Sequence, residues 1–215
     1  MWREVLSFSL LTFSAIFFIV DPLVAVPLFL AITTGDSKEK RRSTARKAAL
    51  VVGAVLTFFA LGGGVLFKLL GVTLPAFQIA GGVLLGLTAL DQLRSQPAKT
   101  RTTPAELEEG AEKADVAIVP LAMPILAGPG SIATVMMLAG KSTSLWELVP
   151  ILGAIWLTAL ICWLVLRGAG WVDRFLGLTG RAILERVFGL LLAAIAVQFI
   201  VDGIRAALPF GVLPS

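Results

Sequence analysis

Long uninterrupted runs of apolar residues constrain this chain more than any other feature of its sequence. An apolar run of about 18 or more residues is long enough to cross a bilayer as a helix. Of the 215 residues, 57% are hydrophobic and only 15% are charged, well away from the composition of a soluble domain. The sequence therefore predicts an all-α membrane protein with six transmembrane helices, one in each of the runs Val5–Ile32, Ala48–Leu70, Thr73–Leu90, Val116–Ala139, Leu148–Leu166 and Val187–Leu208.

The first run has the apolar character of a secretory signal but not its other features. It is too long for a signal core, carries Glu4 beside Arg3, and lacks a small-residue cleavage site. We therefore expect it to remain as a span. Cys162 is the single cysteine and there is no histidine, which excludes an internal disulfide, the common zinc sites and histidine proton relays.

The basic residues are distributed unevenly between the connecting segments. Segments 35–47, 94–113 and 167–186 hold six, four and four Lys or Arg, and only four lie elsewhere in the chain. Cytoplasmic segments of membrane proteins are enriched in this way. The asymmetry predicts that these three segments are cytoplasmic and that both termini are outside. It also makes membrane lipid, and not nucleic acid, the expected partner of the basic segments.

A polar, proline-containing connector divides the chain into two halves. Residues 1–93 would form the first three-helix repeat, 94–115 a cytoplasmic linker, and 116–215 the second three-helix repeat. Each half has two prolines five residues apart, and those of the second half follow Pro22 and Pro27 by 102 residues. The third and sixth runs end in the similar sequences DQLR and DGIR, 111 residues apart.

Three spans is an odd number, so two such copies would lie in opposite orientations. Inverted repeats with interrupted helices at corresponding positions are typical of secondary transporters. The proline positions thus predict that helices 1 and 4 are interrupted near mid-bilayer.

The first predicted break surrounds a carboxylate. Asp21 lies in the middle of the first apolar run, where an acidic residue costs about 2.5–3.5 kcal/mol on insertion scales. Pro22 removes a backbone donor and disfavours helix at Asp21. We expect Asp21 to cap a second half-helix that has Pro22 at its first position. The carboxylate either serves only as this cap or also faces an aqueous cavity, where it would meet a cation, an ammonium group or a proton.

The second predicted break has no side-chain cap. Pro129 suits the first position of a helix, but Gly128 before it has no side-chain acceptor. The amides of Gly130, Ser131 and Ile132 would then point into the break and require a partner. Water or a substrate carboxylate could serve, as at other helix N-termini. Alternatively the break is a proline kink satisfied by Ser131, Thr134 or neighbouring carbonyls.

Together the two breaks suggest a binding site for a zwitterion. Asp21 would face the ammonium group of an α-amino acid, and the amides after Pro129 would face its carboxylate. The predicted substrate-binding residues are Asp21, Pro22, Pro27, Pro124, Gly128, Pro129, Gly130 and Ser131, with Gln78 and Gln198 as weaker candidates for which interhelical hydrogen bonding is the default. The sequence Gly82–Gly86 has the small-xxx-small spacing of closely packed helices, within one protomer or in a homo-oligomer, and internal packing is favoured.

Four segments give the chain its resemblance to a known family. DPLVAVPLF (21–29), FQIAGGVLLG (77–86), PLAMPILAGPGSI (120–132) and GLLLAAIAVQFIVDGI (189–204) resemble the MarC family of prokaryotic inner-membrane proteins. The resemblance implies a relation to LysE-type exporters and, for some members, transport of small neutral amino acids. It also implies that a Gly and often an Asn follow the first Asp-Pro-apolar triplet, which is residues 21–23 here. Here Val24 and Ala25 stand in their place, which makes this corner stiffer and more apolar.

Three classes of function remain to be distinguished. The first is a secondary transporter for small neutral amino acids, either coupled to a proton or sodium or without a coupling ion. The second is an exporter of apolar drugs or metabolites, which would need a wider cavity. The third is a non-transport role, such as an enzyme, for which the sequence offers no nucleophile motif, metal-binding cluster or cofactor motif. The sequence favours the first class.

Overall fold

The computed structural model describes residues 2–94, 126–142 and 145–208, and its regular structure there is entirely helical. The predicted linker 94–115 falls outside the described residues except for Arg94, and so does Pro124. The helices are α1 (Trp2–Val20), α2 (Ala25–Ile32), α3 (Lys38–Leu70), α4 (Leu74–Leu93), α6 (Pro129–Lys141), α7 (Leu145–Arg167) and α8 (Ala169–Ala207).

Four of the described helices are long and apolar enough to cross a membrane. A fifth span is formed if the segment Leu6–Val20 of α1 and the helix α2 are taken together, and these two are bent by 45° at the break between them. The predicted interruption of the first span is therefore confirmed. The fourth predicted run is described only from Leu126, and α6 begins within it at Pro129, as expected.

The helix ends follow from local sequence signals. Ser37 precedes α3, and its hydroxyl accepts a hydrogen bond from the Lys40 amide at 3.2 Å. Gly71 ends the same helix with a φ of 64°, a left-handed conformation that glycine adopts without strain. Thr73 caps α4 in the same way, through the Ala76 amide at 3.3 Å. With 33 residues, α3 is about 50 Å long and extends beyond an apolar layer of about 30 Å.

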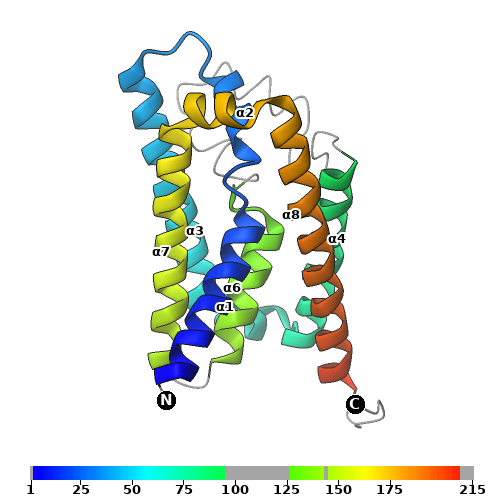
Figure 1. Cartoon of the computed structure of the whole chain (residues 1–215). Helices are drawn as coiled ribbons and strands as arrows, with labels where there is room; N and C mark the ends of the chain where they lie inside the picture. Colours follow the sequence, from blue (N-terminus) through cyan, green and yellow to red (C-terminus); the bar gives the residue numbers. More distant parts are fainter. Residues whose placement is uncertain (1, 95–125, 143–144, 209–215) are drawn as a thin grey trace.

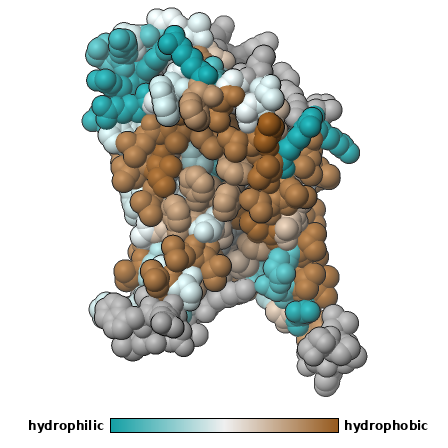
Figure 2. Space-filling model, viewed as in Figure 1, coloured by the Kyte–Doolittle hydropathy of each residue, from teal (hydrophilic) through white to brown (hydrophobic). Residues whose placement is uncertain are grey.

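The long helices stand side by side along one axis (Figure 1). The start of α3, the ends of α4 and α7 and the first part of α8 lie at one end of the bundle, whereas α1 begins and α8 ends at the other. Two of the predicted basic segments, 35–47 and 167–186, thus lie at one end together with Arg94, and we call this the basic end. Figure 2 shows a hydrophobic surface around the middle of the bundle and a hydrophilic surface where α3 begins.

The last helix begins earlier than its apolar run predicts. The segment between the fifth and sixth runs is not a loop, because α8 includes it from Ala169 onwards. Gly177 interrupts this helix with a φ of 59° and a ψ of −173°, and the membrane-spanning part begins at Ala182. The positive φ favours glycine at this position because a Cβ atom would be strained there. The kink lets the first part of α8 cross the basic end (Figure 1).

Close contacts of glycine bring α4 and α8 together. A Cβ atom added to Gly82 would lie 2.7 Å from the Ala196 carbonyl oxygen, and one added to Gly203 would lie 2.9 Å from the Pro75 carbonyl oxygen. Such contacts leave no space for a side chain, so the two backbones approach directly. The predicted internal role of the Gly82–Gly86 motif is confirmed at Gly82. In the same way, Gly81 of α4 faces α6, because a Cβ atom added to Gly81 would lie 2.7 Å from the Ala133 Cβ atom.

Gly82→Ala should lower the thermal unfolding temperature of the purified protein, because its Cβ would push α4 and α8 apart. Overpacking of this kind costs about 1–3 kcal/mol. Gly62→Ala is the matched control: it gains the same helix propensity, and nothing lies within 4 Å of its added Cβ. Equal melting temperatures for the two variants in the same detergent would contradict close packing at Gly82.

Candidate functional site

The break in the first span is centred on a strained acidic residue. Asp21 has a φ of 51°, and it is the only non-glycine residue with positive φ in the described part of the chain. Its amide donates to the Phe17 carbonyl oxygen at 3.0 Å, which completes the last turn of α1. A left-handed residue in this position ends a helix, and Asp tolerates the conformation better than most side chains. Asp21 therefore ends α1.

The second half of this span begins later than predicted. Pro22, Leu23 and Val24 form a turn, so Pro22 is not the first residue of α2 and that prediction was wrong. The helix starts at Ala25 because the left-handed backbone at Asp21 redirects the chain. The Asp21 carboxylate still accepts one hydrogen bond from this turn, from the Val24 amide to Oδ1 at 3.4 Å. Pro27 lies in the first turn of α2, where a missing amide costs little.

Gln92 supplies a second donor to the same carboxylate. Its Nε2 donates to Asp21 Oδ2 at 2.7 Å, and the two residues are 5% and 1% exposed. Hydrogen bonds to a carboxylate are short and strong, and they offset part of the cost of burying it. The Gln92 Oε1 atom is buried and has no hydrogen-bond donor within the described residues.

Sequence reasoning missed Gln92. It lies in the DQLR sequence (91–94), which the sequence predicts only as the end of the third run, with no residue of the binding site. A signal for Gln92 is present in the sequence, because it is a polar amide side chain within one helical turn of the third apolar run. Its hydrogen bond with Asp21 could not be predicted, because the two residues are 71 positions apart.

The start of α6 within the fourth run has the predicted geometry. Gly128 is extended, with φ −73° and ψ 173°, makes no side-chain cap, and is followed by Pro129 at the first position of α6. The Ile132 amide donates to the Gly128 carbonyl oxygen at 3.0 Å, so the prediction that this amide is unsatisfied was wrong. The amides of Gly130 and Ser131 precede this first hydrogen bond of α6 and belong to the positive end of the helix.

Neither hydroxyl near the second break caps these amides. The Ser131 hydroxyl donates to the Leu126 carbonyl oxygen at 3.1 Å, and the Thr134 hydroxyl donates to the Gly130 carbonyl oxygen at 2.8 Å. Both side chains thus satisfy carbonyl oxygens. A simple kink accounts for these carbonyls, but within the described residues neither hydroxyl serves as an acceptor for the first amides of α6.

The first break and the start of α6 lie close together in the protein interior. Val20 and Ala25, on either side of the first break, share one buried cluster with Leu126 and Ala127, which precede the second. A Cβ atom added to Gly130 would lie 3.7 Å from the Ile19 side chain and 2.5 Å from that of Leu85. Asp21 and Ser131 are both buried, so neither break faces lipid in the described structure.

The two glutamines predicted from the sequence lie elsewhere. Gln78 is buried near the start of α4, beside Gly203 of α8, and 14 residues of helix separate it from Gln92, about 21 Å. Gln198 is exposed, and its Nε2 donates to Asp202 Oδ1 at 2.7 Å on the same helix. The expected interhelical hydrogen bond of Gln198 is therefore replaced by one within α8. Asp21 and Gln92 form the polar pair at the first break instead.

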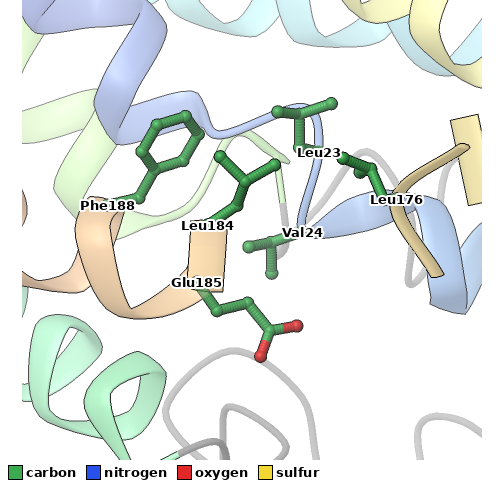
Figure 3. Close-up of a pocket in the computed structure, with 6 residues that line it drawn as sticks. All are labelled: Leu23, Val24, Leu176, Leu184, Glu185 and Phe188. Atoms are coloured by element: carbon green, nitrogen blue, oxygen red, sulfur yellow. The ribbon is translucent and has the colours of Figure 1, made fainter. Parts of the chain in front are cut away.

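A small apolar pocket flanks the first break (Figure 3). Its volume is about 10 Å³, room for about one water molecule. Beside it, the Phe18 and Phe188 rings meet edge to face, with centroids 5.3 Å apart. The apolar residue Val24, where the resemblance leads one to expect a more polar corner, thus lines a small and mainly apolar space. The pocket is lined by Leu23, Val24, Leu176, Leu184, Glu185 and Phe188.

The Asp21–Gln92 pair should show energetic coupling. Gln92→Leu leaves one buried carboxylate oxygen without its donor, which costs about 1–3 kcal/mol. Asp21→Gly keeps the positive φ and removes the carboxylate, so in that background Gln92→Leu should cost much less. Melting temperatures of the two single variants and the double variant in one detergent test this. Additive effects would show that the two side chains do not depend on each other.

Comparisons with known proteins agree over nearly the whole chain. Residues 6–208 match the family described as MarC family integral membrane protein. A UPF0056 membrane protein of Aquifex aeolicus is 39% identical over 90% of both chains, and one of Methanocaldococcus jannaschii is 41% identical over 94% of this chain and 98% of its own. UPF0056 membrane protein YhcE of Escherichia coli is 32% identical over 92% of both chains. No solved structure gave a significant match. The chain therefore belongs to the MarC family of multi-pass integral membrane proteins.

Proposed function

We propose that this protein is a secondary transporter that binds small neutral amino acids, or similar zwitterions, between its two helix breaks. The observation that carries the proposal is the buried Asp21 carboxylate at one break, next to the uncapped start of α6 at the other. An acidic residue inside a membrane protein is costly and usually functional. The substrate's ammonium group would bind at Asp21, and its carboxylate would bind at the amides of Gly130 and Ser131.

The electrostatics of α6 support this orientation of the substrate. The helix has 13 residues, and its first amides carry the positive end of the helix dipole. Because Gly128 offers no side-chain acceptor, an anionic group can approach these amides directly. Val20, Leu126 and Ala127 are apolar and buried around the breaks, which favours a substrate with a small or apolar side chain.

The arrangement of the helices supports an inverted repeat, the architecture of many secondary transporters. The helix α3 packs against α6, and its counterpart in the second half, α7, packs against α1. The counterparts α3 and α7 run in opposite directions, and so do the counterparts α4 and α8 (Figure 1). The two halves differ in their polar groups. At the offsets of 102 and 111 residues, Met123 and Gly203 correspond to Asp21 and Gln92. The first half would thus supply the Asp21 carboxylate, and the second half would supply the backbone amides at the start of α6.

The proposal also includes the orientation in the membrane, the coupling ion and the oligomeric state. The positive-inside rule places the basic end in the cytoplasm and both termini outside, in the plasma membrane of a prokaryote. A proton at Asp21 is one candidate for a coupling ion, and sodium at freed carbonyl oxygens is the other. A homo-oligomer is compatible with the proposal and is not required by it.

The alternative of an exporter for apolar drugs or metabolites is supported by the apolar lining of one pocket, although its volume of about 10 Å³ would have to widen to admit such a solute. The pocket beside the first break is lined mainly by Leu, Val and Phe side chains, and Glu185 is its one charged residue. An apolar solute that enters beside Val24 would not need the amides of α6. Flux measurements can therefore separate the two functions.

Purified protein in liposomes should transport labelled glycine, alanine, serine or threonine under an imposed pH or sodium gradient. Asp21→Asn should reduce this flux on the order of 10- to 100-fold, because a hydrogen bond to a charged group is lost. Asp202→Asn on α8 is the control, since its carboxylate is bound by Gln198 of the same helix. Flux of a drug but of none of the four amino acids would favour the apolar exporter instead.

The proposed orientation can be tested with single cysteines. In a Cys162→Ser background, Val72→Cys lies at the end opposite the basic end, and Lys38→Cys and Arg174→Cys lie at the basic end. An impermeant maleimide should label Val72→Cys in intact cells. It should label the other two only after the membrane is opened. The reverse pattern would overturn the assigned orientation.

A further inference from the structure

A groove runs along the outer surface between α3 and α7, starting at the basic end. Its upper part is a cavity of about 420 Å³ that exposes the side chains of Arg42, Arg46 and Arg167, with Trp163 beside them. Arg42 and Arg46 are one helical turn apart and share a face of α3, whereas Arg167 comes from the end of α7. The Arg167 guanidinium lies over the Trp163 ring at 5.2 Å, which fixes its position by a cation–π contact.

The lower part of the groove is apolar. A second cavity of about 420 Å³ shares Arg46 and Trp163 with the first and continues along Leu50, Trp156 and Leu160. These last three side chains are 52%, 45% and 49% exposed, respectively. The Trp156 ring lies against Gly53, where an added Cβ would approach it to 2.9 Å. The basic and apolar parts therefore form one continuous surface.

The three guanidiniums lie where the apolar part of each helix ends. The sequence has no charged residue between Lys47 and Lys68 on α3, or between Glu147 and Arg167 on α7. Glu39 is the only carboxylate that lines the upper part, and no ion pair joins it to these arginines in the described residues. Three arginines that line one cavity at the edge of an apolar layer favour the binding of an anion there.

We propose that this groove binds one anionic phospholipid. Its phosphate would be held by Arg42, Arg46 and Arg167, since guanidinium matches phosphate oxygens in bidentate geometry. One acyl chain would lie along Leu50, Leu160 and Trp156. From Arg167 to Trp156 is 11 residues of helix, about 16 Å, which is close to the thickness of one leaflet of a hydrocarbon layer of about 30 Å. Free phosphate would leave this apolar part uncovered.

Such a lipid would link helices that support both breaks. The helix α3 packs against α6, and α7 packs against α1. A molecule bound to α3 and α7 together would stabilise their contact and, through it, the two half-helices at the breaks. This effect does not depend on which solute the protein transports.

The test titrates the full-length protein in detergent with phosphatidylglycerol, phosphatidylcholine or inorganic phosphate, and reads the melting temperature. Phosphatidylglycerol should raise it saturably, whereas the other two should not. In the variant R42Q/R46Q/R167Q, the half-saturating concentration of phosphatidylglycerol should rise at least about tenfold, since each basic residue near a membrane surface contributes to anionic lipid binding. K38Q/R174Q/R186Q removes the same charge from exposed positions outside the groove and should bind like the unchanged protein.

A second measurement uses phosphatidylglycerol with brominated acyl chains, which quenches nearby tryptophan fluorescence. Quenching should be stronger than with brominated phosphatidylcholine, and this difference should shrink in W156F and in R46Q, single changes that spare the rest of the bundle. The proposal would be overturned if the two triple variants had the same half-saturating concentration of phosphatidylglycerol. It would also be overturned if the two brominated lipids quenched tryptophan fluorescence equally. Stabilisation by inorganic phosphate alone would assign the arginines to a free anion and overturn the lipid assignment.

Discussion

Backbone amides and carbonyls in an apolar layer must find partners within the protein, and this requirement governs how an interrupted span can be built. At the first break, Asp21 ends α1 with its own amide and serves the following turn with its carboxylate. At the second, Ser131 and Thr134 donate to carbonyls while the first amides of α6 remain ahead of its hydrogen-bond ladder. Different groups therefore lie at the two places, a hydrogen-bonded carboxylate at the first break and backbone amides at the start of α6.

The helix α4 connects the two breaks. Gln92 near its end holds the Asp21 carboxylate, Leu85 covers Gly130, and Gly81 allows Ala133 of α6 to come close. The position of α4 is set in turn by direct backbone contact with α8 at Gly82 and Gly203. Because these contacts leave no free space, a shift of α4 would move both sides of the proposed site together.

On the outer surface, apolar and basic side chains of α3 and α7 are arranged in separate regions. The helices α3 and α7 expose apolar side chains, and their arginines lie in the sequence where the apolar part of each helix ends. Figure 2 shows the hydrophobic surface around the middle of the bundle. This distribution satisfies the positive-inside rule, and it also creates a local site in which three guanidiniums converge. General topology and specific lipid binding can therefore arise from the same residues.

The sequence by itself determined the membrane class, most of the span positions, the interruption at Asp21 and the start of α6 at Pro129, because hydrophobic length and proline geometry act locally. It did not determine that Asp21 is left-handed, that α2 starts at Ala25, or that the first part of α8 is helical. The partnership of Asp21 with Gln92 and the separation of Gln78 and Gln198 from the breaks were decided by tertiary structure alone. Contacts between residues so far apart depend on how α4 and α8 pack, and hydrophobic periodicity contains no information about that packing.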